Sequence, residues 1–269
     1  MNDTTRQGDR LLVFGDDGSP GADVAWLWVC NHRWPRWRAE VLTSTPPAIA
    51  PPLEHRAELT EWNSPHPRML VAQSELAAVR TLTVAQDPRI MLGRRSDADL
   101  IVVGPRAMSR ARALMLGSTT DWLVHHPPAP LAIIRSATPV RRVLACIDGS
   151  AHALRALHAF ALFPWAADTE VVIVSVNEGR FVADEGVHDA LATLEAVGAT
   201  TAVDTVEGKP TDMILDLIDA FEPQLVVLGT RGLTGWKRLR LGSTAGAVAH
   251  CAPCSVLVAC ADDADTERE

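Results

Sequence analysis

An internal duplication constrains the fold of this chain more than any other feature of its sequence. Twice, an apolar run typical of a buried strand leads into a glycine-rich loop that ends in Gly-Ser-Thr. The later copy consists of Gly229, Gly232, Gly242, Ser243 and Thr244. The earlier copy consists of Gly104, Gly117, Ser118 and Thr119, each 125 positions before its counterpart. A repeat at a constant offset predicts two copies of one folding unit.

A second motif supports the duplication and indicates where each copy begins. An apolar run ends in Asp-Gly-Ser at Asp17 and again at Asp148, an offset of 131, so small gaps separate the landmarks of the two copies. A chain of 269 residues accommodates two domains of about 130 residues each. We predict domains over 9–137 and 140–261.

Strands and helices alternate along the second copy. β-Branched and apolar runs predict strands at 142–147, 170–176, 200–206, 225–228 and 255–259. Helical periodicity lies between them at 151–163, 187–197, 211–220 and 244–250. Such alternation predicts the α/β class, here as two tandem, doubly wound, mostly parallel five-stranded sheets.

The glycine loop has the residue types of a phosphate cradle. Glycines let backbone N–H groups approach an anion closely, and the following helix adds positive potential at its N-terminus. Hydroxyls of Ser243 and Thr244 are expected to cap that helix and to donate to phosphate oxygens. The plainer interpretation is a glycine-rich strand-to-helix loop without a ligand, just as Asp148 and its neighbours could form only a turn and an N-cap. We favour a binding role for Asp148, because such crevices lie at the carboxyl ends of strands.

With these motifs the chain resembles the UspA-like universal stress proteins of the ATP-binding type. The resemblance rests on the segments 147–150, 208–210, 226–244 and 250–259. It implies an adenine-nucleotide α-hydrolase-like fold, with Asp148 near the base and ribose and Val176 lining the adenine pocket. It also implies that Gly229, Gly232, Gly242, Ser243 and Thr244 hold the ribose and phosphates. In the family that the chain resembles, domains pair through the last strand, which implies a pseudo-dimer of the two halves within the chain. The resemblance leaves open whether two chains also form a homodimer.

The first half departs from this pattern at two positions. Ala107 replaces the counterpart of Gly232, and Pro105 replaces that of Thr230, so we expect crowding of the phosphate and one lost donor. We therefore predict that ATP, with or without Mg²⁺, binds mainly to the second half. A weaker set in the first half comprises Asp17, Gly104, Gly117, Ser118 and Thr119. The proline-rich stretch 46–67 is expected to be an irregular insertion near the same edge.

The composition limits the kinds of partner and the cellular location expected for this chain. A net charge of −8 makes nucleic acid an unexpected partner, and the apolar runs are too short for a membrane span, so we expect a cytoplasmic protein.

The five cysteines, including the pair Cys251 and Cys254, fit reduced thiols better than metal or redox chemistry. Core or domain-interface packing is the favoured interpretation of Trp26, Trp28, Trp34 and Trp37. Trp236 lies inside the glycine loop.

The predicted function is a nucleotide-binding sensor or regulator of a stress response. We nominate no catalytic or metal-binding residue, because no set of nucleophile, base and orienting group accompanies the binding motif. The sequence leaves open whether the protein hydrolyses ATP slowly. The alternatives are a ligand-free stress scaffold, an ATP-hydrolysing or adenylating enzyme of the same superfamily, and a flavin binder.

Overall fold

The computed structural model describes residues 10–45, 74–105, 116–177, 184–231 and 241–260. The strands are β1 (Arg10–Asp16), β2 (Trp37–Ser44), β3 (Ala78–Val84), β4 (Leu100–Val103), β5 (Leu131–Ile133), β6 (Arg142–Cys146), β7 (Glu170–Asn177), β8 (Thr200–Glu207), β9 (Leu225–Gly229) and β10 (Ser255–Ala259). The helices are α1 (Pro20–Cys30), α2 (Pro88–Gly93), α3 (Ser118–His125), α4 (Ala151–Ala161), α5 (Asp184–Val197), α6 (Pro210–Phe221) and α7 (Ser243–Cys251). No helix in these ranges is long and apolar enough to cross a bilayer.

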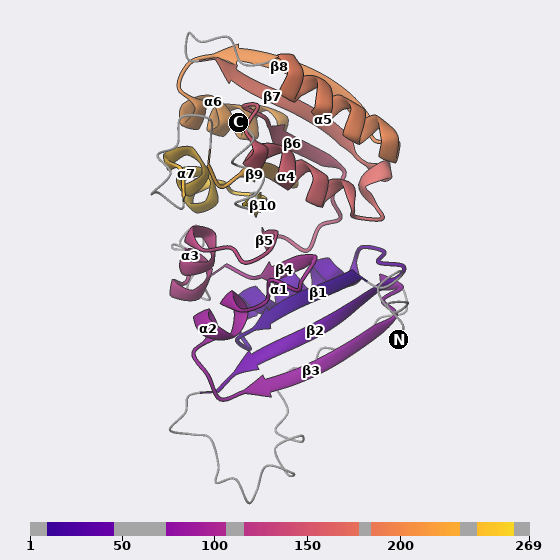
Figure 1. Ribbon diagram of the computed structural model, residues 1–269, viewed down its shortest axis with the longest axis vertical. Helices are drawn as coiled ribbons and strands as arrows, with labels where there is room; N and C mark the ends of the chain where they lie inside the picture. Colours follow the sequence, from indigo (N-terminus) through magenta and orange to yellow (C-terminus); the bar gives the residue numbers. More distant parts are fainter. Residues whose placement is uncertain (1–9, 46–73, 106–115, 178–183, 232–240, 261–269) are drawn as a thin grey trace, which may run out of the picture.

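The ten strands form one continuous sheet in the order β3-β2-β1-β4-β5-β10-β9-β6-β7-β8 (Figure 1). Five strands come from each half of the chain, and neighbours within a half run parallel. The halves meet where β5 pairs antiparallel with β10, centred on Ala132 opposite Leu257. The α/β class with two five-stranded, doubly wound units is confirmed. The pairing of last strands implied by the resemblance is present within the chain.

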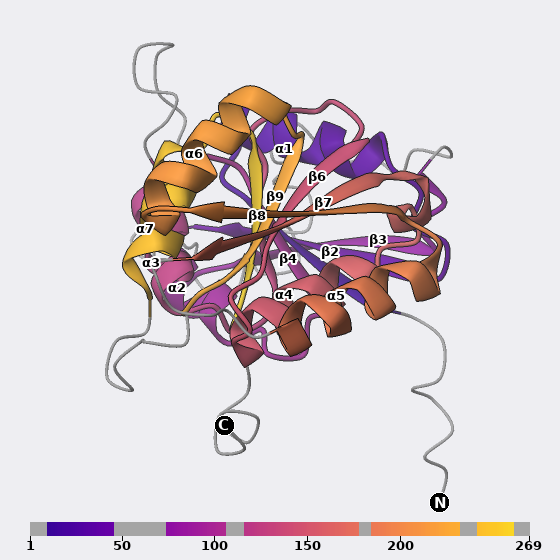
Figure 2. The same cartoon turned by 90° about the horizontal axis from the view of Figure 1, so that it is seen from above.

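Helices cover both faces of this sheet. The side chains of α1, α4 and α5 belong to one buried cluster, whereas those of α2, α3, α6 and α7 belong to another. Figure 2 shows the two groups on opposite sides of the strands. The carboxyl ends of the parallel strands in each half are therefore left open between helix N-termini, where ligands bind in sheets of this kind.

The Asp-Gly-Ser motif builds the same turn in both halves. The carboxylates of Asp17 and Asp148 each accept a hydrogen bond from the backbone N–H two residues later, at 3.0 Å. Gly18 and Gly149 adopt φ values of 69° and 82°, which favour glycine. The serine that follows caps α1 or α4. The turn and N-cap of the plainer interpretation are thus present.

An aromatic cluster fills the seam between the halves on the α1 side. Trp34 of the first half lies 5.5 Å from Phe163 and 5.9 Å from Trp165 of the second half, between ring centroids. Trp28 lies 5.7 Å from Trp165, and Trp37 lies 6.2 Å from Phe163. The interpretation of the first-half tryptophans as core and interface residues is confirmed.

A partly buried arginine, which sequence analysis did not single out, joins the two halves on the other side of the seam. Arg135, just after β5, donates to the carbonyl oxygens of Cys254 and Ala249, the latter in the last turn of α7. A cation at a helix C-terminus is stabilised by the exposed carbonyl groups there. Burial lowers the pKa of Arg135 below its usual value, and Cys254 and Cys251 partly oppose this effect.

Candidate functional site

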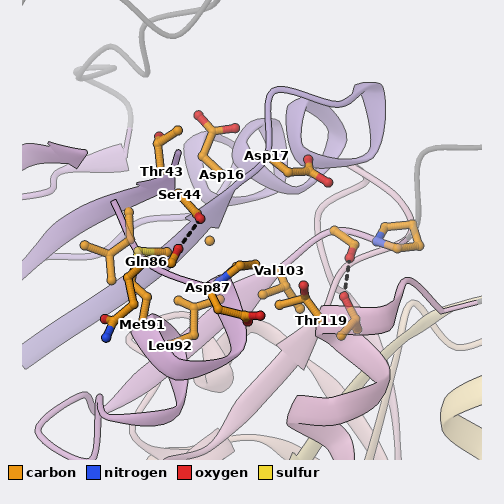
Figure 3. Close-up of a pocket in the computed structure, with 16 residues that line it drawn as sticks. Asp16, Asp17, Thr43, Ser44, Gln86, Asp87, Met91, Leu92, Val103 and Thr119 are labelled. Atoms are coloured by element: carbon orange, nitrogen blue, oxygen red, sulfur yellow. Dashed lines mark hydrogen bonds between the residues drawn. The ribbon is translucent and has the colours of Figure 1, made fainter. Parts of the chain in front are cut away.

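A pocket of about 620 Å³ opens at the carboxyl ends of β1, β2 and β4. The starts of α2 and α3 complete its wall, through Asp87 and Thr119 among others. Figure 3 shows these strand ends, with Ser44 and Gln86 joined by a hydrogen bond on one side of the space and Thr119 on the other. The pocket lies in the first half, which the sequence led us to expect to be the weaker binder.

Several sequence predictions fall on residues outside the described ranges. Gly232 and Trp236 lie in the segment 232–240, and Ala107 lies in 106–115. The contrast between Gly232 and Ala107 therefore stays a prediction, as does the interpretation of 46–67. The structure describes the elements around these loops, namely the strand ends, the Asp-Gly-Ser turns and the helix N-termini.

The remaining second-half residues gather at one edge of the sheet. Asp148 follows β6, Val176 lies near the end of β7, and Gly229 ends β9. Ser44, which lines the first-half pocket, is the register counterpart of Val176. Gly15 pairs with Leu42 and its equivalent Cys146 pairs with Val174, so Ser44 and Val176 each lie two residues beyond an equivalent strand partner. The repeat therefore places Val176 where a first-half residue borders a real cavity.

The N-terminus of α7 has no side-chain cap. Gly242 is the N-cap residue, with extended φ and ψ of −74° and 153°, and its N–H donates to the carbonyl of Thr230 at 2.7 Å. Gly117 is likewise the N-cap residue of α3, with φ and ψ of −70° and 158°. The expectation that Ser243 and Thr244 cap this helix is wrong, because both lie inside its first turn. Their equivalents Ser118 and Thr119 are placed likewise.

The glycine that ends the strand before each loop is required by packing. A Cβ atom on Gly229 would lie 2.5 Å from the backbone N of Ala153 in α4. A Cβ on Gly104 would lie 2.5 Å from the backbone carbonyl group of Gly21 in α1. Both distances are shorter than any real Cβ contact, so these two glycines let the first helix of each half approach the central strand.

Substitution of Gly229 by alanine should therefore lower the free energy of unfolding by about 1–3 kcal/mol, because helix and strand would have to separate. Urea denaturation monitored by circular dichroism measures the change. Gly246→Ala is the matched control, since its Cβ would meet only the side chain of Leu241 at 3.3 Å and alanine favours the helix. Equal stability of Gly229→Ala and the wild type would contradict the packing role.

The proline in the first-half loop removes a different donor from the one expected. Thr230, the counterpart of Pro105, is fully buried and donates its backbone N–H to the carbonyl of Ala259 at 3.0 Å. That bond extends the pairing of β9 with β10. The prediction that Pro105 costs a phosphate donor is therefore wrong, because the donor at this position serves the sheet.

Two titratable groups near these strand ends have shifted pKa values. Hydrogen bonds from the Arg89 side chain, and then from its backbone N–H, lower the pKa of Asp87 to about 2. Burial, with smaller contributions from Asp148 and Cys254, raises the pKa of Cys146 to about 12. Asp87 is therefore an anion and Cys146 a neutral thiol at neutral pH.

Within the described ranges, the other reactive side chains do not assemble into a metal site. Burial raises the pKa of Cys254 to about 11, while Cys251 is exposed. Among the described residues no three His, Cys, Asp or Glu side chains are grouped to hold an ion. His250, at the end of α7, lies 2.9 Å from the carboxylate of Asp121 in α3 and so contributes to the seam.

Comparison with known proteins gives consistent matches along the chain. The model of the Universal stress protein family matches residues 10–135 and 178–259. Universal stress protein Rv1996 of Mycobacterium tuberculosis is 27% identical, with 95% of this chain and 96% of the relative covered. Universal stress protein Rv2623 of the same organism is 26% identical, with 92% and 95% covered. The crystal structure of a universal stress protein from Archaeoglobus fulgidus superposes with a TM-score of 0.70 at 22% identity, covering 94% of this chain and 98% of that one.

Proposed function

The chain belongs to the universal stress protein family, and we propose that it binds an adenine nucleotide, ATP with Mg²⁺, mainly through its second half. The proposed contacts are those of Asp148, Val176, Gly229, Gly232, Gly242, Ser243 and Thr244. The uncapped N-terminus of α7 carries this proposal. Its first N–H groups have no side-chain acceptor from the N-cap position, and they meet the same sheet edge as Asp148 and Val176. Free N–H groups and the helix dipole at one point favour a phosphate.

Each part of the nucleotide has a candidate surface in this arrangement. Val176 is a partly buried apolar residue that can pack against the base. The half-buried carboxylate of Asp148 can accept hydrogen bonds from ribose hydroxyls. The hydroxyls of Ser243 and Thr244 lie in the first turn of α7, where they can donate to phosphate oxygens.

We place the protein among regulators, in which the bound nucleotide alters contacts with a partner, and not among enzymes. The last strands of both halves already pair with each other. A homodimer would therefore have to use another surface. A cytoplasmic site of action stays a prediction from the sequence.

The Gly242→Asp variant should weaken ATP binding at least thirtyfold, which corresponds to about 2 kcal/mol. The added carboxylate stands at the N-cap of α7, where it would satisfy the helix N–H groups itself and repel the phosphates. Isothermal titration calorimetry of both proteins with Mg-ATP measures this, with stoichiometry near one for the wild type. Unchanged affinity in the variant would refute the assignment of this site, and no heat with the wild type would favour a ligand-free scaffold.

A further inference from the structure

We propose that His152 is a positioning residue of the second-half site, which acts through Thr230 to fix the N-terminus of α7. This role serves the proposed nucleotide site and rests on that proposed function. His152 is the second residue of α4, just after the turn that contains Asp148. It is only 4% exposed, so its ring is buried at the sheet edge where the nucleotide contacts are proposed.

The ring of His152 reaches the residue that follows β9. Its Nδ1 lies 3.5 Å from the hydroxyl oxygen of Thr230, which is 0% exposed. This is a long hydrogen bond, and either atom can be the donor. A buried hydroxyl group needs a polar partner, and His152 is the partner that the described residues provide for Thr230. The pair therefore holds the Thr230 side chain in one orientation.

The backbone of Thr230 joins the sheet to the start of α7. Its N–H donates to the carbonyl of Ala259 in β10 at 3.0 Å, and its carbonyl accepts the N–H of Gly242 at 2.7 Å. Gly242 is the N-cap residue of α7, the helix end proposed to hold the phosphates. A shift of Thr230 would therefore move this helix end relative to the strands.

Two further contacts bring the first turn of α4 against the same stretch of chain. The hydroxyl of Ser150 donates to the carbonyl of Arg231 at 3.2 Å while it accepts the N–H of Ala153 at 3.2 Å. A Cβ atom on Gly229 would lie 2.8 Å from the Cβ of His152. Residues 229–231 thus all contact the first turn of α4, which links the Asp148 turn to the beginning of the glycine loop.

The first half lacks this pair of side chains. The equivalents of His152 and Thr230 are Gly21 and Pro105. A Cβ on Gly21 would lie 2.5 Å from the carbonyl oxygen of Pro105, so a histidine does not fit there, and proline has no hydroxyl group. In the described part of the first half, no hydrogen bond joins Gly117, the N-cap of α3, to Pro105. The histidine–threonine pair therefore belongs to the half that is proposed to bind the nucleotide.

Amide hydrogen exchange of the full-length, ligand-free protein, followed by NMR, tests the positioning directly. His152→Ala should raise the exchange rate of the Gly242 amide about tenfold or more, because the carbonyl that accepts its hydrogen bond is less firmly held. His152→Asn should stay close to the wild type, since asparagine places a polar atom near the position of Nδ1. His32→Ala is the matched control: His32 is also a buried histidine, but it lies before β6 at the opposite edge and should leave Gly242 unchanged.

Thr230→Val repeats the test from the other partner if His152→Ala does not fold, as judged by circular dichroism. Valine keeps the size of threonine and leaves both backbone hydrogen bonds possible. We expect the same increase in Gly242 exchange, and a double variant that exchanges about as fast as either single variant, because both remove one contact.

Calorimetry with Mg-ATP and with adenosine measures the consequence for binding. His152→Ala and Thr230→Val should each weaken Mg-ATP binding about tenfold but adenosine binding less than about threefold, because only the phosphates contact the N-terminus of α7. His152→Asn should restore most of the ATP affinity. A general packing defect would instead weaken both ligands alike.

Unchanged Gly242 exchange in His152→Ala and Thr230→Val would overturn the positioning role. ATP affinity that neither variant changes would overturn it as well, as would equal losses for ATP and adenosine, or a loss that His152→Asn does not restore. Failure of the proposed nucleotide site has a different signature: the wild type would not bind ATP, while Gly242 exchange would still respond to the two variants.

Discussion

Replacement of Trp34 by alanine is expected to lower the free energy of unfolding by about 3–5 kcal/mol, the usual cost of removing a large, fully buried aromatic side chain. Trp34 is 0% exposed, and its ring lies within 5.9 Å of four other aromatic rings, two from each half. Its indole N–H donates to the carbonyl of Val29 at 2.9 Å. Truncation therefore leaves a cavity at the seam and removes this hydrogen bond.

Urea denaturation followed by far-ultraviolet circular dichroism measures this loss. Trp122→Ala is the matched control, because Trp122 is only half-buried on α3 and stacks on His126 at 4.7 Å within the first half. We expect a clearly smaller loss for the control. A loss below about 1 kcal/mol in Trp34→Ala would mean that the aromatic cluster does not hold the halves together.

Acidification from pH 7 to pH 4.5 is expected to destabilise the protein through His32. This ring is 5% exposed, and its Nε2 accepts the backbone N–H of Val140 at 2.9 Å, in the link between the halves. Its Nδ1 lies 2.7 Å from the carbonyl of Trp28 and so must be the donor. Burial is the main cause that lowers the pKa of His32 from 6.5 to about 4, and Arg141 acts in the same direction.

The direction of the effect follows from the pH at which His32 becomes protonated in the folded and in the unfolded state. The unfolded imidazole becomes protonated as the pH falls below about 6.5, whereas the folded one stays neutral down to about pH 4. Protons therefore favour the unfolded state in this window, and stability present above pH 6.5 is lost on acidification. The difference between the two pKa values corresponds to a total loss of about 3 kcal/mol in the free energy of unfolding.

Comparison with His32→Gln isolates this contribution, since a glutamine side chain can accept and donate hydrogen bonds but does not titrate. Urea denaturation at several pH values should give curves that converge as the pH falls, the wild type losing more stability than the variant. Parallel curves between pH 7 and pH 4.5 would show that His32 is not the group responsible. The imidazole chemical shifts in NMR spectra supply an independent pKa.

Much of the fold could be predicted from the local pattern. All nine second-half elements lie within about three residues of the predicted bounds, because β-branched runs, proline and capping residues act over a few positions. The duplication predicted that the two glycine loops start at equivalent edges of the sheet, since a repeated strand and loop must reach equivalent places in equivalent units. It predicted neither the capping role of Gly242 nor the packing role of Gly229, which depend on neighbours distant along the chain.

The sequence by itself therefore determined the class of fold, the number of units and the edge of the sheet at which ligands are expected, because periodicity and repeated spacing are local properties of a chain. The family resemblance implied that the halves pair through their last strands, but only the tertiary structure decided the antiparallel register of that pairing and the residues that surround the first-half pocket. The register of β5 with β10, the burial of His32 beside Trp165, and the carboxylates around the first-half pocket all bring together residues far apart in sequence. Such contacts depend on the packing of whole elements, which no short stretch of sequence encodes.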